Sequence, residues 1–144
     1  MATKIQVTFD CADPDRLARF WADALGYEFE KPPAGYDSWE AYWGDRGVPE
    51  DELDDASSVV DPAGAGPRIF FQKVPEGKVV KNRLHLDLDA RGGRDVPLAL
   101  GKERINAEAD RLARVGATKL HAMEEGGGYF VVMQDPEGNE FCVH

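Results

Sequence analysis

A single histidine interrupts a run of alternating apolar and polar residues, RLHLDLDA, at residues 83–90. His85 and Asp87 have the same parity, so an extended strand would place an imidazole and a carboxylate on one face. Such a pair can bind a divalent metal, take part in ligand binding or proton transfer, or form a purely structural hydrogen bond. The choice depends on what the rest of the chain places beside these two residues.

Other catalytic signals are weak. The chain contains neither GxSxG nor HExxH, and its GAGP and GGG glycines fall in expected turns, so no dinucleotide- or phosphate-binding loop is indicated. Cys142 could act as a nucleophile with His85, or it could be a buried and inert thiol. The sequence does not place the two side chains in contact.

The composition is that of a small acidic globular protein. The chain has 144 residues, a formal net charge of −10, 42% hydrophobic residues and two cysteines. We expect one domain over residues 1–144, with neither nucleic acid nor a membrane as a partner, because the surface is acidic and no apolar run could span a bilayer. The amino terminus, MATKIQVTFD, has no apolar signal core, and two cysteines make no disulfide framework, so a cytoplasmic location is expected.

Local patterns predict strands alternating with helices. Residues 5–11 alternate with period two, and Asp13 with Pro14 then begins a helix that Gly26 ends. A second helix is expected at residues 103–115, ended by Gly116. Further strands are expected at residues 27–31, 57–61, 68–74, 82–90, 118–122, 129–134 and 141–144.

The two halves of the chain repeat this order of elements. Each half reads as strand, helix, glycine and three strands, with Gly26 and Gly116 at matching places. A helix covers only one face of such a sheet, so the other face has to be covered by the twin module. We therefore predict an α+β fold in which two βαβββ modules, about residues 1–78 and 79–144, pair into a concave cleft.

The period of two also assigns the two faces of each module's first strand. The apolar residues expected beneath the helices are Val7, Phe9, Cys11, Leu84, Leu86 and Leu88. The polar residues expected to face the cleft are Gln6, Thr8, Asp10, His85, Asp87 and Asp89. Phe70, Phe71 and Phe130 are expected in the core.

Residues 32–67 form a long irregular insertion in the first module. Its acidic run, EDELDD, is expected to be solvated, but it also carries Tyr36, Trp39, Tyr42 and Trp43, which a disordered linker would not usually hold. We expect a helical turn near Trp39. The four rings either form a wall that stacks on a flat ligand or serve only to pack the loop, and the sequence favours neither.

Three stretches together resemble the vicinal oxygen chelate superfamily, which contains glyoxalase I, bleomycin-resistance proteins and extradiol dioxygenases. They read IQVTFDCADPDRLARFWADALGYEF, NRLHLDLDA and GGYFVVMQDPEGNEFCVH, and they span nearly the whole chain apart from residues 32–67. The set is similar in particular to glyoxalase-like proteins of actinobacteria. The resemblance implies the glyoxalase/bleomycin-resistance fold.

In metal-bearing members, the resemblance implies four ligands from the first and last strands of the modules. Carried over by position, these fall on Gln6, Gln72 (or Phe71 if the register shifts by one), His85 and Cys142. Metal-bearing members usually have glutamate where Cys142 stands. Two amides and a thiol neutralise little of a divalent charge and leave no general base, so no metal or other cofactor is predicted. A site made from His85, Asp87 and Glu140 stays open as an alternative.

These observations favour a protein that binds a small aromatic or polycyclic molecule without a catalytic metal, as resistance and sequestration proteins do. An acidic cleft could favour cationic ligands. The expected cleft residues are Gln6, Asp10, Trp39, Trp43, Gln72, His85, Asp87, Glu140 and Cys142. The alternative is a metal-dependent or His85-assisted lyase, isomerase or dioxygenase, and a partner-binding module without a ligand is a third option. The sequence leaves open whether the chain is an enzyme and whether it forms a homodimer.

Overall fold

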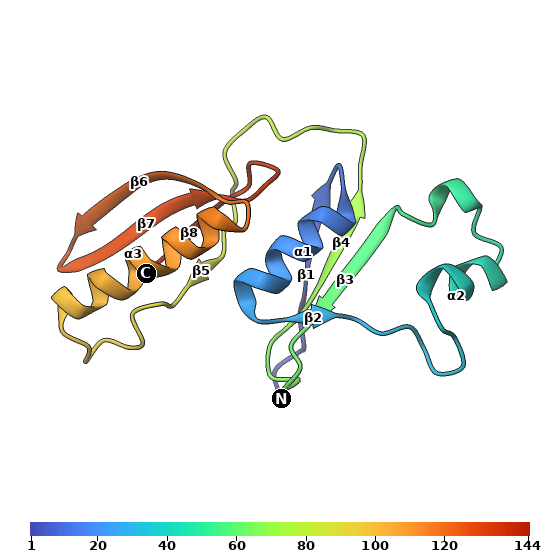
Figure 1. Cartoon of the computed structure of the whole chain (residues 1–144), viewed down its shortest axis with the longest axis horizontal. Coiled ribbons are helices and arrows are strands. Elements are labelled where there is room, and N and C mark those ends of the chain that lie inside the picture. The colour runs from blue at the N-terminus through green and yellow to red at the C-terminus, as the bar shows by residue number, and fades with distance from the viewer. The chain divides into compact units, whose positions relative to one another are not determined.

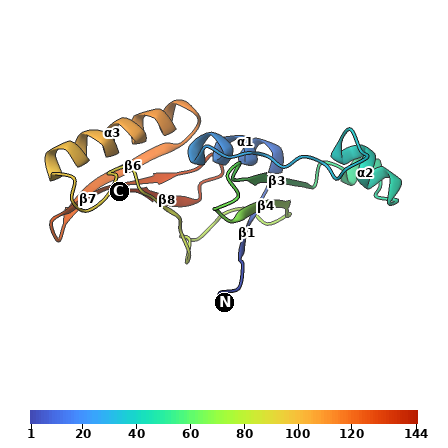
Figure 2. The same ribbon diagram turned by 90° about the horizontal axis from the view of Figure 1, so that it is seen from below.

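The computed structural model describes residues 1–144, which divide into two compact units, Met1–Gly77 and Lys78–His144. We call these unit one and unit two. Each unit holds one four-stranded sheet with one long helix along one of its faces (Figures 1 and 2).

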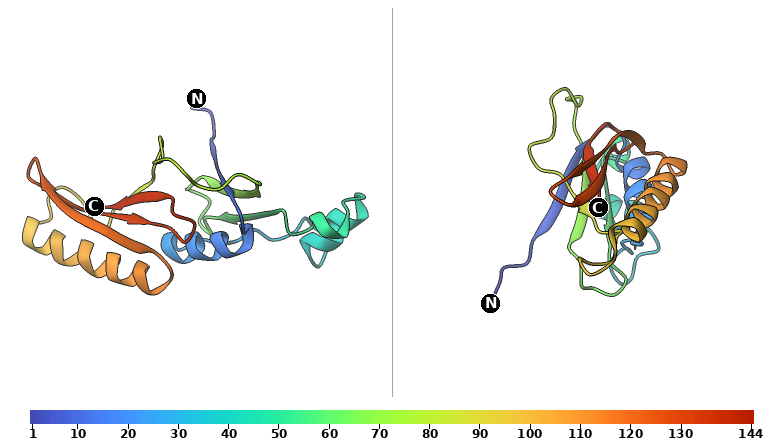
Figure 3. Two further views of the ribbon diagram at one scale, coloured as in Figure 1. Left: turned by 90° about the horizontal axis from the view of Figure 1, so that it is seen from above. Right: turned by 90° about the vertical axis from the view of Figure 1, so that its left-hand side faces the viewer.

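Unit one has the strand order β1-β4-β3-β2. Its elements are β1 (Gln6–Cys11), α1 (Pro14–Leu25), β2 (Glu28–Phe29), α2 (Trp39–Asp45), the 3-10 turn Glu50–Glu52, β3 (Ala56–Val60) and β4 (Arg68–Lys73). β1 runs parallel to β4, and the other neighbours are antiparallel. The α2 segment lies beyond the β2–β3 edge of the sheet and does not cover either face (Figures 1 and 3).

Helix α1 begins and ends as its sequence predicts. The Asp13 side chain accepts a hydrogen bond from the Arg16 backbone N–H at 3.1 Å, and Pro14 fills the first turn, where an N–H is not needed. Gly26 ends the helix in the left-handed conformation, at φ +69°. Leu17 and Trp21 lie at most 1% exposed between the helix and the sheet, so this apolar stripe forms the core of unit one.

Unit two has the strand order β5-β8-β7-β6. Its elements are β5 (Asp87–Leu88), α3 (Leu98–Arg114), β6 (Thr118–Glu125), β7 (Gly128–Gln134) and β8 (Glu140–Val143). Both units are therefore βαβββ modules, and the predicted α+β fold is confirmed. The pairing of the modules into one cleft stays a prediction. None of the helices is long and apolar enough to cross a membrane.

Two expectations for unit two were wrong. Of the strand expected at residues 82–90, only Asp87 and Leu88 form a strand in register with β8, and Leu84 is 73% exposed instead of lying beneath a helix. Helix α3 begins at Leu98, well before residue 103. Gly101 suggested a loop, but it lies buried in the helix, where a Cβ would come within 3.0 Å of the Arg91 side chain.

Two of the three phenylalanines expected in the core lie elsewhere. Phe71 is fully buried, but Phe70 and Phe130 are only partly buried and have the opposite parity to the core residues of their strands, Ile69, Phe71, Val131 and Met133. Phe70 and Phe130 therefore lie on the helix-free faces of the sheets.

Candidate functional site

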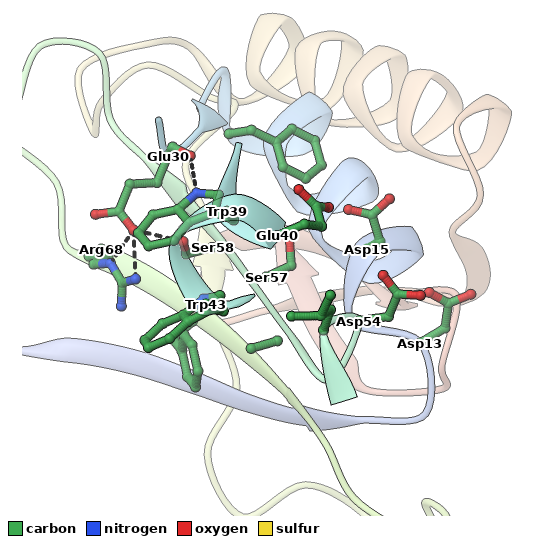
Figure 4. A pocket seen from close by; sticks show the side chains of 14 residues that line it. Asp13, Asp15, Glu30, Trp39, Glu40, Trp43, Asp54, Ser57, Ser58 and Arg68 are labelled. Atoms are coloured by element: carbon green, nitrogen blue, oxygen red, sulfur yellow. Dashed lines mark hydrogen bonds and ion pairs between the residues drawn. The ribbon is translucent and has the colours of Figure 1, made fainter. Parts of the chain in front are cut away.

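A pocket of about 480 Å³ lies within unit one, beside the edge of the sheet and α2 (Figure 4). Its aromatic lining comes from Phe29 on β2, Trp39 and Trp43 on α2, and Phe70 on β4. Its polar lining includes Glu30, Ser58 and Arg68. Residues from distant parts of the chain thus meet around one cavity, which we call the unit-one pocket.

The two indole rings of α2 form one wall of this pocket. Trp39 and Trp43 stack with their centroids 6.1 Å apart and their planes 21° from parallel. The Trp39 Nε1–H donates a 2.7 Å hydrogen bond to the Glu30 backbone carbonyl, and this bond ties α2 to the chain that follows β2. Ser38 caps α2 by accepting from the Ala41 backbone N–H at 3.1 Å. The wall is therefore fixed at both its backbone and its ring.

Of the four loop aromatics, only Trp39 and Trp43 line the unit-one pocket. Tyr36 and Tyr42 stand edge to face at 5.1 Å and do not line it. Tyr42 also contacts Trp43 edge to face at 4.8 Å. The tyrosines thus support the wall that the tryptophans present.

An ion pair closes another side of the pocket. One carboxylate oxygen of Glu30, Oε2, accepts hydrogen bonds from Arg68 Nε at 2.9 Å, Arg68 Nη2 at 2.6 Å and Ser58 Oγ at 2.7 Å. Burial raises the pKa of Glu30, but the hydrogen bonds from Arg68 and Ser58 and the charge of Arg68 outweigh it and leave the pKa below its ordinary value. Glu30 is therefore ionised at neutral pH.

Sequence reasoning missed Glu30, Arg68 and Phe70 as pocket residues. A signal for two of them was available, because Arg68 and Phe70 share strand parity with Gln72, which is among the expected cleft residues. For Glu30 there was no comparable signal, since its partner Arg68 lies 38 residues away and is brought close only by the sheet.

The cleft residues predicted on β1 and β4 do not line the pocket. They lie on the helix-free face of unit one, where the Gln6 Oε1 accepts from Arg68 Nη1 at 2.9 Å and the Gln72 Nε2 donates to Asp10 Oδ1 at 2.8 Å. Phe71 is buried on the opposite face, so Gln72 is the residue of this pair that faces outward.

Unit two brings three of the predicted residues together. The His85 Nδ1 lies 2.8 Å from Asp87 Oδ1, and Asp87 lies opposite Cys142 in the β5–β8 ladder. One potential ligand atom from each of the three residues lies within 4.8 Å of the others. Burial raises the pKa of the Cys142 thiol, and the charge of Asp87 and a hydrogen bond to it raise it further. The thiol is therefore a weak nucleophile at neutral pH.

Glu140 is held apart from this group by other partners. Its carboxylate forms an ion pair with Lys78 Nζ at 3.1 Å and accepts from the Asn82 backbone N–H at 3.1 Å. Burial raises the pKa of Glu140, but these hydrogen bonds and the charge of Lys78 outweigh it and lower the pKa. The group that the structure assembles is thus His85 with Asp87 and Cys142.

Comparison with known proteins places this architecture in a family. The model of the glyoxalase-like domain matches residues 6–144. The chain belongs to the glyoxalase-like domain family. No curated protein sequence matches it. The similarity to the actinobacterial members of this family stays a prediction.

Solved structures share the fold of this glyoxalase-like chain at low identity. A glyoxalase/bleomycin resistance protein/dioxygenase family enzyme from Burkholderia phytofirmans PsJN has a TM-score of 0.61 at 15% identity, over 96% of this chain and 94% of that one. A mutant of the fosfomycin resistance protein FosX from Listeria monocytogenes has a TM-score of 0.62 at 12% identity, over 100% of this chain and 90% of that one. That mutant is complexed with Mn(II) and 1S,2S-dihydroxypropylphosphonic acid. Oxidase ChaP-H2 has a TM-score of 0.57 at 16% identity, over 99% of this chain and 92% of that one.

The match of the glyoxalase-like domain model confirms the family that the sequence resembles, and the solved structures share its fold; one of them, the FosX mutant, is complexed with Mn(II). In this glyoxalase-like chain, the unit-one positions do not fit a divalent cation. The Gln6 carbonyl oxygen already accepts from the guanidinium of Arg68, whose positive charge would repel the ion. Gln72 offers a neutral amide and Phe70, beside it on the same face, offers no ligand atom. His85, Asp87 and Cys142 in unit two are by contrast ligand types that zinc accepts.

Proposed function

We propose that this glyoxalase-like protein binds a small aromatic or polycyclic molecule in the unit-one pocket, without a catalytic metal. The observation that carries the proposal is the stacked pair Trp39 and Trp43 on the wall of a cavity. A flat ring lying against these indoles would bury apolar area and gain aromatic contact at once.

The size and chemistry of the pocket support a small-molecule ligand. Its volume, about 480 Å³, lies within the range of about 300–1,000 Å³ that is usual for ligand pockets. Such pockets combine apolar walls with a few fixed polar groups. Here the rings of Phe29, Trp39 and Trp43 supply the walls, and the Glu30–Arg68 pair supplies the fixed polar groups.

The absence of a metal from the proposal rests on the residues of unit one. The side chains that correspond to metal ligands in superfamily members are amides, and Arg68 already binds one of them. The proposed role is therefore sequestration of a ligand. Neither Cys11 nor Cys142 forms a disulfide, which suits the cytoplasmic location that we also propose.

Tryptophan fluorescence tests this proposal directly. Trp21 is 1% exposed in the core, so ligand binding should quench only Trp39 and Trp43, and the Trp21 emission serves as an internal reference. The full chain is titrated with flat tricyclic and tetracyclic aromatics, including acridine and N-methylacridinium. We expect Trp43→Ala to weaken binding about fivefold to tenfold through lost stacking.

The matched control is Leu100→Ala, which removes a similarly exposed apolar side chain of unit two, 40% exposed against 37% for Trp43. It should leave binding unchanged. Quenching by none of the aromatic probes, or equal binding by Trp43→Ala and the parent protein, would show that the indole pair only packs the loop. Size-exclusion chromatography of the same samples tests whether the chain forms a homodimer.

A second candidate is a metal-dependent or His85-assisted enzyme of the same superfamily, a lyase, isomerase or dioxygenase. The observation that favours it is the proximity of potential ligand atoms on His85, Asp87 and Cys142. If a metal binds there, these residues would hold it and it would supply Lewis-acid chemistry. Without one, the Asp87 carboxylate would fix the His85 ring so that the Nε2 atom could exchange a proton. Elemental analysis of the purified chain separates these two forms of the enzyme hypothesis.

A further inference from the structure

We propose that the ligand of the unit-one pocket is an organic cation, namely a flat aromatic ring that carries a quaternary or protonated nitrogen. This inference rests on the proposed function and adds the charge of the ligand to it. It follows from three features of the lining: the excess of negative charges, the hydrogen bonds that its single basic residue already makes, and the exposed faces of its aromatic rings.

The charges of the lining are strongly unbalanced. Five carboxylates line the pocket, and they come from Asp13, Asp15, Glu30, Glu40 and Asp54. Arg68 is the single basic residue of the lining. The electrostatic potential inside is therefore negative, and it attracts a positive ligand while repelling an anion.

The one base in the lining already directs each of its guanidinium nitrogens to an acceptor within unit one. Arg68 Nε and Nη2 both donate to Glu30 Oε2, and Nη1 donates to Gln6 Oε1, so each of the three guanidinium nitrogens is engaged. An anionic ligand would have to compete with a carboxylate that already binds Arg68 through two hydrogen bonds. The Glu30–Arg68 pair thus acts as a neutral wall of the pocket.

Some of the acids are not neutralised. Neither Glu40 nor Asp54 makes an ion pair or a side-chain hydrogen bond, whereas Asp15 pairs with Arg19 at 2.7 Å. In Figure 4 these three acids and Asp13 stand to the right of the two indoles, and Arg68 stands to the left. The pocket therefore has a negative end and a neutral end, with the tryptophans between them in this view.

The aromatic walls favour a cation for an independent reason. The face of an indole ring carries partial negative charge and attracts a cation that lies over it. Within the same aromatic cluster, the guanidinium of Arg46 already lies over Tyr42, with its Cζ 4.1 Å from the ring centroid. Trp39 and Trp43 offer a pocket ligand the same kind of surface, next to carboxylates that are not paired.

The test compares one ring system in three charge states. N-methylacridinium is a permanent cation and acridine-9-carboxylate is an anion. Acridine is neutral when the pH of the assay lies above the pKa of its ring nitrogen. Their dissociation constants are measured with the full chain by tryptophan quenching and by calorimetry. We expect N-methylacridinium to bind at least about tenfold more tightly than acridine, and the carboxylate more weakly still.

Charge-removing variants locate the effect. Glu40→Gln with Asp54→Asn should weaken N-methylacridinium binding about fivefold to tenfold and leave acridine binding unchanged. The matched control is Glu76→Gln with Asp95→Asn, two exposed acids outside the lining that change the net charge equally. Raising the salt concentration should weaken the binding of the cation only.

The outcomes separate this inference from the proposed function. If acridine and N-methylacridinium bind equally well, or if the control pair of variants acts as strongly as the pocket pair, the cation inference is overturned while the aromatic pocket stands. If none of the three probes binds, and the wider aromatic panel also fails to quench the tryptophans, the proposed function falls as well.

Discussion

The ion pair between Arg68 and Glu30 should stabilise unit one measurably. Two of the three hydrogen bonds to Glu30 Oε2 come from Arg68, and the side chains are 33% and 28% exposed, so the pair lies between a surface pair and a buried one. An exposed pair contributes about 0–1 kcal/mol, and breaking a buried one costs about 3–5 kcal/mol. We expect Arg68→Met to lower the free energy of unfolding by about 2 kcal/mol, and a double-mutant cycle with Glu30→Gln to give a coupling energy of about 1–1.5 kcal/mol.

The pH dependence of this coupling has a definite sign. The pKa of Glu30 lies below its ordinary value of 4.5 because hydrogen bonds and the charge of Arg68 outweigh the effect of burial. A carboxyl with a lowered pKa stabilises the folded state fully above the ordinary value, and the stabilisation is lost as the pH falls through the lowered pKa. The coupling energy should therefore be constant near neutral pH and disappear in acid.

Urea unfolding followed by circular dichroism measures each corner of the cycle. The matched control is Arg19 with Asp15, an ion pair of nearly the same length, 2.7 Å against 2.6 Å, with side chains 69% and 58% exposed. Its coupling should be about 0.3–0.5 kcal/mol. The Arg68–Glu30 coupling energy could prove no larger than that of the control pair, or it could fail to weaken in acid. Either result would refute the claim that Glu30 holds Arg68 firmly and neutralises it in the pocket wall.

Three further predictions concern unit two. Elemental analysis of the purified chain should find no stoichiometric Zn, Mn, Fe or Ni, and one metal per chain that disappears in His85→Ala would contradict the metal-free proposal. Alkylation of Cys142 by iodoacetamide should be slow at neutral pH because burial and the charge of Asp87 raise the thiol pKa, and Asp87→Asn should speed it and shift its pH profile toward lower pH. An unchanged profile would rule out that electrostatic contact. In urea unfolding, Leu112→Ala should cost about 2–5 kcal/mol because Leu112 is fully buried, while Leu84→Ala, at 73% exposure, should cost less than about 0.5 kcal/mol. Equal losses would mean that Leu84 is covered in solution.

Much of the fold could be predicted because it depends on neighbours along the chain. Asp13 caps α1 and Gly26 ends it through contacts within a few residues, and both positions were read correctly. The alternation in β1 placed Cys11 beneath the helix and Gln6 on the other face for the same local reason. The repeat of these signals in the second half predicted the second βαβββ module.

The errors lie where a local signal had two physical meanings. Gly101 is a residue type that is common in loops, yet here it lies in α3, where its missing side chain allows the close approach of Arg91. Leu84 continues the alternation of β5, but no residue of β8 pairs with it, so nothing buries its side chain. A pattern along the chain cannot show whether a partner strand is present.

The sequence by itself determined the two modules and the two faces of β1, because capping and periodicity act over a few residues, and the resemblance of its motifs indicated the family. Only the tertiary structure brought Glu30 to Arg68, 38 residues away, and arranged the indoles of α2 beside them as a pocket. It also placed Cys142 next to Asp87. These contacts depend on strand order and register, which are set by packing among segments that are distant in sequence.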